Sequence, residues 1–346
     1  MKVAIVNSQA IGLFGGAEFL ADHLKIKLVE HGFDAQIIRF PFSWYPAENI
    51  VDSMMAVRLA CLDNTDRVIG LRFPAYLVEH PDKRLWLLHQ FRQAYDLHGT
   101  EFGMFGDNER DRGIRDAVRR MDTHCLKSLE GRIHTNSHIA SERLMKYNGI
   151  ASEVLFPPLF DAHLYSSGPL GDYLFYPSRV NHSKRQYLAV EAMRLTKSGV
   201  KLVLAGKGDT AEDEERIHRR IEEYGLKDRI LYLNRFISQE EKAEYYRNSL
   251  GVVYIPYDED SYGYVTLEAM QSEKAILTCS DSGGTDVVVL EGRTGHVAAP
   301  TPDSLAEAMD EMFLHRGRTE EMGRNGPALI RELGIDWDRV IERLTQ

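Results

Sequence analysis

The chain has 346 residues, of which 43% are hydrophobic and 27% charged, and its formal net charge is −10 at pH 7. This length favours two domains of ordinary size, and the composition is that of a soluble globular protein without repeats or low-complexity segments. The negative charge argues against a nucleic-acid binder held by phosphate contacts and gives no reason to expect a broad basic membrane surface.

The amino terminus and the cysteines bear on where the protein works. The segment MKVAIVNSQAIGLFGG carries one lysine and a short apolar run, so it is predicted to be a first strand and not a signal peptide. No run of residues reaches the length of a transmembrane helix. Cys61, Cys125 and Cys279 lie far apart without a CxxC pair, which favours reduced thiols over disulfides or structural zinc. The sequence therefore predicts a cytoplasmic protein.

Strand-like and helix-like segments alternate along the chain, as is typical of α/β proteins with parallel sheets. Six strands are expected in the first half, in the segments KVAIVN, AQIIRF, RVIGL, RLWLLH, RIHTNS and SEVLF. Six more are expected in the second half, in YLFYPS, KLVLAG, RILYL, GVVYIP, AILTCS and HVAA. The segment FPPLFDAHLYSSGPLGD, rich in turn residues, separates the two sets. Two sheets in sequence are therefore predicted, with a terminal helix anchored by Trp337.

The loops at the carboxyl ends of parallel strands are the expected ligand sites. After the first strand, Gly15 and Gly16 precede a helix expected from about Ala17, where exposed amides attract anions. The segment matches neither GxGxxG nor a Walker loop, so a tight turn without a ligand is an equal alternative. His89 ends the apolar strand WLLH, although a lone histidine there is more often structural than catalytic.

Three arginines, Arg112, Arg115 and Arg119, fall near one face of a predicted helix in ERDRGIRDAVRRM. A solvated and partly salt-bridged face is the simpler interpretation. The alternative is a patch that contacts a membrane or an acceptor, which would place the protein at the inner face of a membrane.

In the second half, Arg179 follows the first strand and Lys184 opens the next helix. Cations usually avoid a helix N-terminus because the dipole repels them. Two of them in one loop suggest an anion between them, most simply a diphosphate, although a charged surface is the alternative. The turn at Gly283 and Gly284 supplies further amides.

The segment DEDSYGYVTLEAM follows a buried-strand pattern and predicts a turn at Gly263 and a helix from about Tyr264. Asp260 then precedes the helix, and Glu268 lies one turn inside it, so both border the helix start. Carboxylates would repel an anion bound there. They are therefore expected to bind the vicinal hydroxyls of a sugar or a ribose.

These motifs resemble a known family. SYGYVTLEAM, PSRVNHSKR, LVLAGKGD and SGGTDVVVLEGRTGHVAA resemble the second domain of the retaining glycosyltransferases of family 4, and GGAE and TNSHIASERLMKYNGIASEVLFPP resemble parts of the first. The resemblance implies the GT-B fold, in which two Rossmann-like parallel-sheet domains face each other across a cleft. The domains would span residues 1–165 and 166–330, with a terminal helix in 331–346 that crosses back to the first domain.

The resemblance also implies an activity. It is the transfer of a hexose, with retention at the anomeric carbon, from a nucleotide-diphosphate sugar of the UDP or GDP type. The acceptor would be a hydroxyl of a glycan, a glycolipid or a small molecule, as in polysaccharide biosynthesis. No cofactor and no metal ion are expected, because two cations take the metal's place.

Carried over by position, the resemblance gives roles to the residues of the second domain. Arg179 and Lys184 would hold the donor diphosphate. Asp260 would bind hydroxyls of the transferred sugar, and Glu268 would bind the ribose. The amides around Gly263, Tyr264 and Val265 would meet sugar and phosphate.

In the first domain, His89 would lie over the sugar near the reacting carbon, and Gly15 and Gly16 would let the backbone approach donor or acceptor. Two positions depart from the family. Asp260 stands where the family usually has Glu, which leaves the donor-sugar contact one methylene short. Asn234 stands in place of a turn glycine, and asparagine tolerates the left-handed backbone expected there.

Other interpretations stay open. A phosphorylase on this fold would need a site for pyridoxal phosphate, and the chain shows no lysine motif for it; an epimerase is the other enzymatic alternative. A catalytically silent accessory protein is a third, disfavoured by Arg179, Lys184 and Glu268 and weakly favoured by Asp260. If Glu268 is a core residue instead of a ligand, its change to Gln should unfold the protein.

Overall fold

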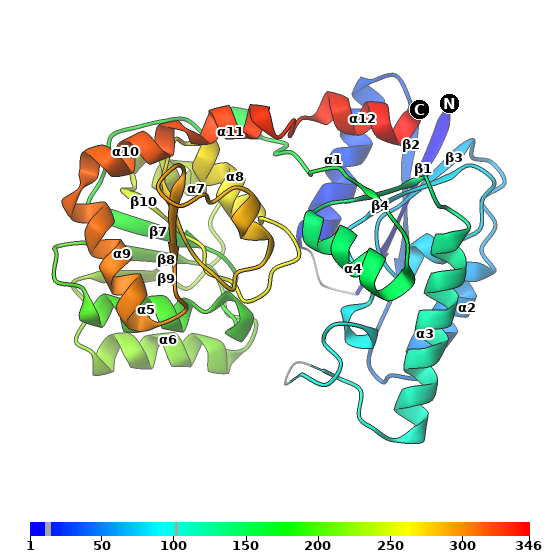
Figure 1. Ribbon diagram of the computed structural model, residues 1–346, viewed down its shortest axis with the longest axis horizontal. Coiled ribbons are helices and arrows are strands. Elements are labelled where there is room, and N and C mark those ends of the chain that lie inside the picture. Colours follow the sequence, from blue (N-terminus) through cyan, green and yellow to red (C-terminus); the bar gives the residue numbers. More distant parts are fainter. Residues whose placement is uncertain (11–14, 101–102) are drawn as a thin grey trace. The chain divides into compact units, whose positions relative to one another are not determined.

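The structure is a computed structural model, and it describes residues 1–10, 15–100 and 103–346. The chain forms two compact units. Unit 1 comprises Met1–Pro157 with Ile335–Gln346, and unit 2 comprises Pro158–Gly334. Each unit contains one six-stranded sheet flanked by helices (Figure 1).

The sheet of unit 1 has the strand order β2-β1-β3-β4-β5-β6, and every pairing in it is parallel. Its strands are β1 (Lys2–Gln9), β2 (Asp34–Pro41), β3 (Arg67–Gly70), β4 (Lys83–Leu87), β5 (Ile133–Thr135) and β6 (Glu153–Val154). Its helices are α1 (Gly16–Glu30), α2 (Asn49–Arg58), α3 (Glu109–Lys127), α4 (His138–Asn148) and α12 (Trp337–Thr345).

Successive residues of β1 point to opposite faces of this sheet, and both faces are buried. Val3 and Ile5 pack with α1 and α12, whereas Ala4 and Val6 belong to the core that includes α2 and α3. This two-sided burial explains the continuous apolar runs in the sequence. The terminal helix α12 belongs to unit 1, where Trp337 packs edge-on against Trp86 of β4 at 6.1 Å between ring centroids.

The sheet of unit 2 has the order β12-β11-β10-β7-β8-β9 and is also parallel throughout. Its strands are β7 (Tyr173–Pro177), β8 (Lys201–Ala205), β9 (Ile230–Leu233), β10 (Gly251–Val253), β11 (Ile276–Cys279) and β12 (Gly295–Ala298). Its helices are α5 (Gln186–Leu195), α6 (Ala211–Glu223), α7 (Gln239–Asn248), α8 (Tyr264–Gln271), α9 (Pro302–Leu314), α10 (Arg316–Arg324) and α11 (Gly326–Glu332). The prediction of two parallel sheets with flanking helices is confirmed.

The boundaries of the units differ slightly from those expected after residues 165 and 330. The first boundary follows Pro157 because the segment before β7 packs on unit 2. The ring of Tyr165 lies edge-on to that of Tyr246 at 5.7 Å, and its hydroxyl donates a hydrogen bond to Gln239 at 3.2 Å.

The expected left-handed backbone at Asn234 is wrong, because Asn234 is not one of the residues with positive φ. Its side chain instead donates to Glu214 at 2.9 Å and accepts from the hydroxyl of Tyr232 at 3.2 Å. Asn234 thus fixes this turn through a side-chain hydrogen bond to α6, and the turn does not need the positive φ that a glycine would allow.

A buried carboxylate lies inside unit 1. Asp122 of α3 is 0% exposed and accepts hydrogen bonds from the hydroxyls of Tyr76 and Tyr95, each at 3.0 Å. Burial raises the pKa of Asp122 to about 7, and the two hydroxyls oppose this rise only in part. Asp122 therefore holds a proton more tightly in the folded state than in the unfolded state, where its pKa is about 3.9.

This shift predicts a pH-dependent stability. Because the pKa of Asp122 is higher in the folded state, the stabilisation that Asp122 contributes is complete below about pH 4. This stabilisation is lost as the pH rises to about 7. The free energy of unfolding should fall over this range by up to about 4 kcal/mol. In Asp122→Asn, which keeps an acceptor and a donor for the two tyrosines, this component should vanish. Urea unfolding of both proteins at pH 5 and pH 8 measures it, and equal pH slopes would contradict the prediction.

Across residues 1–10, 15–100 and 103–346, every helix is too short or too polar to span a lipid bilayer.

Candidate active site

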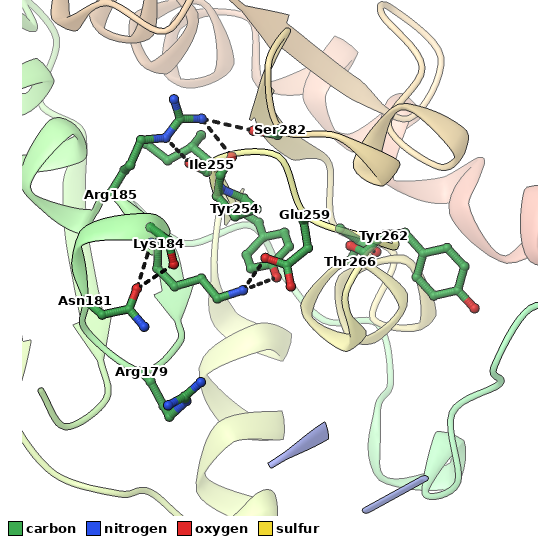
Figure 2. Close-up of polar contacts among 12 residues, drawn as sticks. Arg179, Asn181, Lys184, Arg185, Tyr254, Ile255, Glu259, Tyr262, Thr266 and Ser282 are labelled. Carbon is green, nitrogen blue, oxygen red and sulfur yellow. Dashed lines mark hydrogen bonds and ion pairs between the residues drawn. The ribbon is translucent and has the colours of Figure 1, made fainter. Parts of the chain in front are cut away.

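Of the residues of unit 2 that are expected to bind a ligand, Arg179, Lys184 and Asp260 lie in loops that follow parallel strands, whereas Glu268 lies in α8. Residues 178–185, here the cation loop, follow β7, and residues 257–262, here the acidic loop, come after β10. The turn at residues 280–284 follows β11. Because β7, β10 and β11 are neighbours in a parallel sheet, these loops share one edge of it (Figure 2).

Lys184 ends a short 3₁₀ turn, His182–Lys184, capped by the side chain of Asn181, which accepts from the Lys184 amide at 2.9 Å. The Lys184 side chain is 13% exposed and points away from its own loop (Figure 2). Its ammonium group donates to the Tyr254 hydroxyl at 3.0 Å and to Glu259 Oε2 at 2.5 Å. Lys184 thus joins the cation loop to the acidic loop.

The electrostatics of this triad keep Lys184 charged. Burial alone lowers the pKa of Lys184, but Tyr254 and Glu259 outweigh burial, so that the pKa lies above its ordinary value. Burial, followed by the charge of Glu259, raises the pKa of Tyr254 to about 12, against the opposing effect of Lys184. At neutral pH the site therefore presents an ammonium group beside a neutral phenol.

Arg179 lies on the same loop and has a different partner. One of its terminal nitrogens donates to both carboxylate oxygens of Asp209, at 3.0 and 3.1 Å. Asp209 is also held by the side chain of Asn181 at 2.9 Å. The Arg179 side chain is 54% exposed, so much of its guanidinium faces solvent.

Arg185 is a site residue that the sequence patterns did not predict. It is 7% exposed and points away from Lys184 (Figure 2). Its guanidinium donates to the carbonyls of Ile255 at 2.8 Å and Pro256 at 2.7 Å. It also forms a two-pronged pair with Asp281, with both distances at 2.8 Å. Arg185 therefore ties the chain after β10 to the turn after β11 and fixes the acidic loop between them.

The glycine turn predicted at residues 282–286 supports the acidic loop through its backbone. The amide of Gly284 donates to the carbonyl of Glu259 at 3.0 Å, and Gly283 forms a bridge with Glu259. At Gly283, where φ is +65°, an added Cβ would lie 2.3 Å from the Glu259 carbonyl oxygen. The amide of Gly284, expected to face a ligand, is thus used to hold the acidic loop.

Helix α8 begins at Tyr264, as predicted, with Gly263 as its N-cap. The Tyr264 hydroxyl is buried and has no hydrogen-bond partner among the residues that the structure describes, and burial raises its pKa. The carbonyl of Val265 accepts from the Tyr246 hydroxyl at 3.2 Å.

Gly263 is constrained both by its backbone and by its neighbour. Its φ is +74°, and an added Cβ would lie 2.6 Å from the Tyr254 hydroxyl oxygen. In Gly263→Ala we expect loss of about 2–3 kcal/mol of stability, together with at least tenfold weaker nucleotide binding, because Tyr254 positions Lys184.

The matched control is Gly225→Ala, since Gly225 has φ +64° but no atom within 4 Å of the added Cβ. It should cost about 1–2 kcal/mol and leave nucleotide binding unchanged. Thermal unfolding and calorimetric titration with nucleotides measure both effects. Nucleotide binding that is equal in the two variants would contradict the role given to Tyr254.

Glu268, expected to bind a ribose, is 6% exposed. Its Oε1 accepts from Lys242 of α7 at 2.6 Å, and its Oε2 accepts from the Tyr246 hydroxyl at 2.8 Å. A carboxylate has about four acceptor positions, so Glu268 can accept further hydrogen bonds from hydroxyls. Asp260 is partly buried in the acidic loop beside Glu259.

In unit 1, Gly15 caps α1, which begins at Gly16. The Gly15 amide donates to Glu18 Oε2 at 2.9 Å, and Glu18 also pairs with Arg72 at 3.1 Å. A carboxylate of the chain itself thus occupies the expected anion position at the Gly15 amide. The preceding residues 11–14 of the glycine-rich segment lie outside the described residues.

His89 lies just beyond β4, partly buried, with Nδ1 at 2.6 Å from the carbonyl oxygen of Gln90. The three arginines of α3 do not form one exposed surface. Arg112 is exposed, and Arg119 stacks over Tyr95 at 5.5 Å. Arg115 is partly buried, and its Nε has no hydrogen-bond partner among the described residues. In the part of the chain that the structure describes, no cluster of three or more His, Cys, Asp or Glu side chains could hold a metal ion.

The similarity to a known protein family lies in unit 2. Residues 171–329, within unit 2, match the family of glycosyl transferases group 1. An α-1,3/1,6-mannosyltransferase, ALG2 of Dictyostelium discoideum, is 28% identical over 141 residues, which are 39% of this chain and 33% of that protein. An uncharacterised glycosyltransferase of Methanocaldococcus jannaschii, MJ1607, is 25% identical over 98% of this chain and 96% of its own length.

A solved structure extends the likeness to the whole fold. Alr3699/HepE of Anabaena, solved in complex with UDP-glucose, is 16% identical and superposes with a TM-score of 0.72 over 99% of this chain and 98% of that one. Unit 2 therefore carries a glycosyl transferases group 1 domain, and the whole chain has the GT-B fold. The protein is a retaining, nucleotide-sugar-dependent glycosyltransferase of group 1.

Proposed function

We propose that this glycosyltransferase transfers a hexose from a UDP- or GDP-linked donor to a hydroxyl of a glycan or glycolipid, and that Arg179 and Lys184 hold the donor diphosphate. The observation that carries the proposal is the placement of both cations on the loop after β7. Two of the proteins that resemble the chain support a hexose donor, since ALG2 is a mannosyltransferase and HepE was solved with UDP-glucose.

The reaction needs stabilisation of charge on the departing diphosphate, because the bond from the anomeric carbon to its oxygen breaks. The ammonium of Lys184 and the guanidinium of Arg179 supply fixed positive charge at that group. With retention, the acceptor hydroxyl approaches on the face that the phosphate leaves. A phosphate oxygen there takes the acceptor's proton, so no protein nucleophile is required.

The carboxylates then bind hydroxyls. Glu268, fixed by Lys242 and Tyr246, offers its remaining acceptor positions to the ribose. Asp260 offers its oxygens to the transferred sugar, and the amides at the start of α8, around Gly263, Tyr264 and Val265, meet the phosphate. In unit 1, we expect His89 to lie over the sugar near the reacting carbon, and Gly15 and Gly16 to let the backbone approach donor or acceptor.

Calorimetric titration with UDP, GDP, ADP and their common sugar conjugates, with EDTA present, tests the proposal. Micromolar binding of one nucleotide is the expected result, and it would identify the donor class. If the folded protein binds none of them, the chain is better explained as a silent member of its family. With the donor known, NMR of the product checks that the anomeric configuration is retained.

A further inference from the structure

The two cations of the cation loop differ in how they are paired. Arg179 keeps 54% of its side chain exposed beside Asp209, and a guanidinium has five N–H donors. A phosphate can therefore add to Arg179 without removing its partner. Lys184 is 13% exposed and already donates to Tyr254 and Glu259. Of its three N–H donors, one remains for a phosphate beside these two bonds to described residues.

A phosphate on that remaining donor would lie near the Glu259 carboxylate. With Glu259 Oε2 at 2.5 Å from Nζ and a phosphate oxygen at about 2.8 Å from it, tetrahedral geometry places the two oxygens about 4 Å apart. Both groups are negatively charged and partly shielded from water, so they repel. The phosphate must either bind against this repulsion or displace Glu259.

The backbone of Glu259 is held in place independently of its side chain. Its amide donates to the carbonyl of Ser282 at 3.3 Å, and its carbonyl accepts from Gly284 at 3.0 Å. Its side chain is 31% exposed. Removing the charge should therefore leave the acidic loop in place.

We propose that Glu259 is a positioning residue that holds Lys184 in the empty site and opposes the diphosphate there, so that it limits nucleotide affinity and speeds release of the nucleoside diphosphate after transfer. This inference rests on the proposed function of the same site. The two adjacent carboxylates then have different tasks, with Glu259 acting on Lys184 and Asp260 on the sugar.

The test is Glu259→Gln, which keeps an acceptor for the Lys184 ammonium but removes the charge. Calorimetric titration with UDP and GDP should show about tenfold tighter binding of the nucleotide that the wild-type protein binds. Binding of uridine or guanosine, which lack phosphate, should not change. The KM for the matching sugar donor should fall with the dissociation constant, while product inhibition by the nucleotide becomes stronger.

The matched control is Asp258→Asn, which removes one charge from the same loop at a neighbouring position and should change nucleotide affinity less than twofold. Equal or weaker nucleotide binding by Glu259→Gln, with thermal stability retained, overturns the role of Glu259 and leaves the proposed function standing. If neither UDP nor GDP binds the wild-type protein or the variant, the donor site itself fails, and this inference fails with it.

Discussion

Replacement of Lys184 by alanine should lower turnover about 100- to 1,000-fold, because it removes a fixed charge from the leaving diphosphate. The effect on folding should be small. Glu259 is 31% exposed and can be hydrated when its partner is lost. The buried Tyr254 hydroxyl loses one hydrogen bond, at a cost of about 1 kcal/mol. The measurements are kcat and KM for the donor, nucleotide affinity by calorimetry and the thermal unfolding temperature.

Lys201→Ala is the matched control. Lys201 begins β8, so it lies at the amino edge of the sheet of unit 2, opposite the cation loop. It is 51% exposed and pairs with Asp172 at 2.8 Å, an exposed pair that contributes little. This variant should keep full turnover. A Lys184→Ala protein that is unstable but still active would refute the assignment, since Lys184 would then be a structural residue.

Much of the fold follows from sequence patterns, because both sheets are buried on two faces. Apolar runs such as the one in β8 need helices on each side, and this requirement predicts parallel sheets without any knowledge of pairing. The start of α8 is equally predictable, since Gly263 adopts a positive φ that other residues disfavour.

The site was only partly predictable, for a physical reason visible in Lys184 and Arg185. The two cations are adjacent in the sequence, and nothing in their order says which one faces the ligand. Arg185 adopts φ +56°, which directs it to Asp281, while Lys184 points to Glu259. Which of the adjacent carboxylates Glu259 and Asp260 meets Lys184 depends in the same way on backbone pairing with the turn after β11. These contacts join residues distant in the chain, so no local pattern records them.

The position of Arg185 leads to a second large effect, on stability. Arg185→Ala removes a buried guanidinium that bonds two backbone carbonyls and the carboxylate of Asp281. Breaking a buried ion pair costs about 3–5 kcal/mol. Asp281 is 34% exposed and regains water, so we expect about 3 kcal/mol, at the lower end of that range. Nucleotide binding should weaken as well, because the chain after β10 loses its attachment to the turn after β11.

Two further variants test whether the loss of stability in Arg185→Ala comes from the geometry of its ion pair or from the loss of any arginine side chain. Arg185→Lys keeps the charge but cannot reproduce the two-pronged geometry, so it should lie between wild type and alanine in stability. Arg194→Ala removes an exposed arginine of α5, the helix that follows Arg185, and should cost less than about 1 kcal/mol; Arg194 stacks on Tyr224 at 4.9 Å. Urea unfolding followed by circular dichroism compares all three with wild type. If Arg185→Ala costs no more than Arg194→Ala, then the acidic loop is held by its backbone bonds to residues 281–284 alone, and the arrangement of Lys184 and Glu259 does not depend on Arg185.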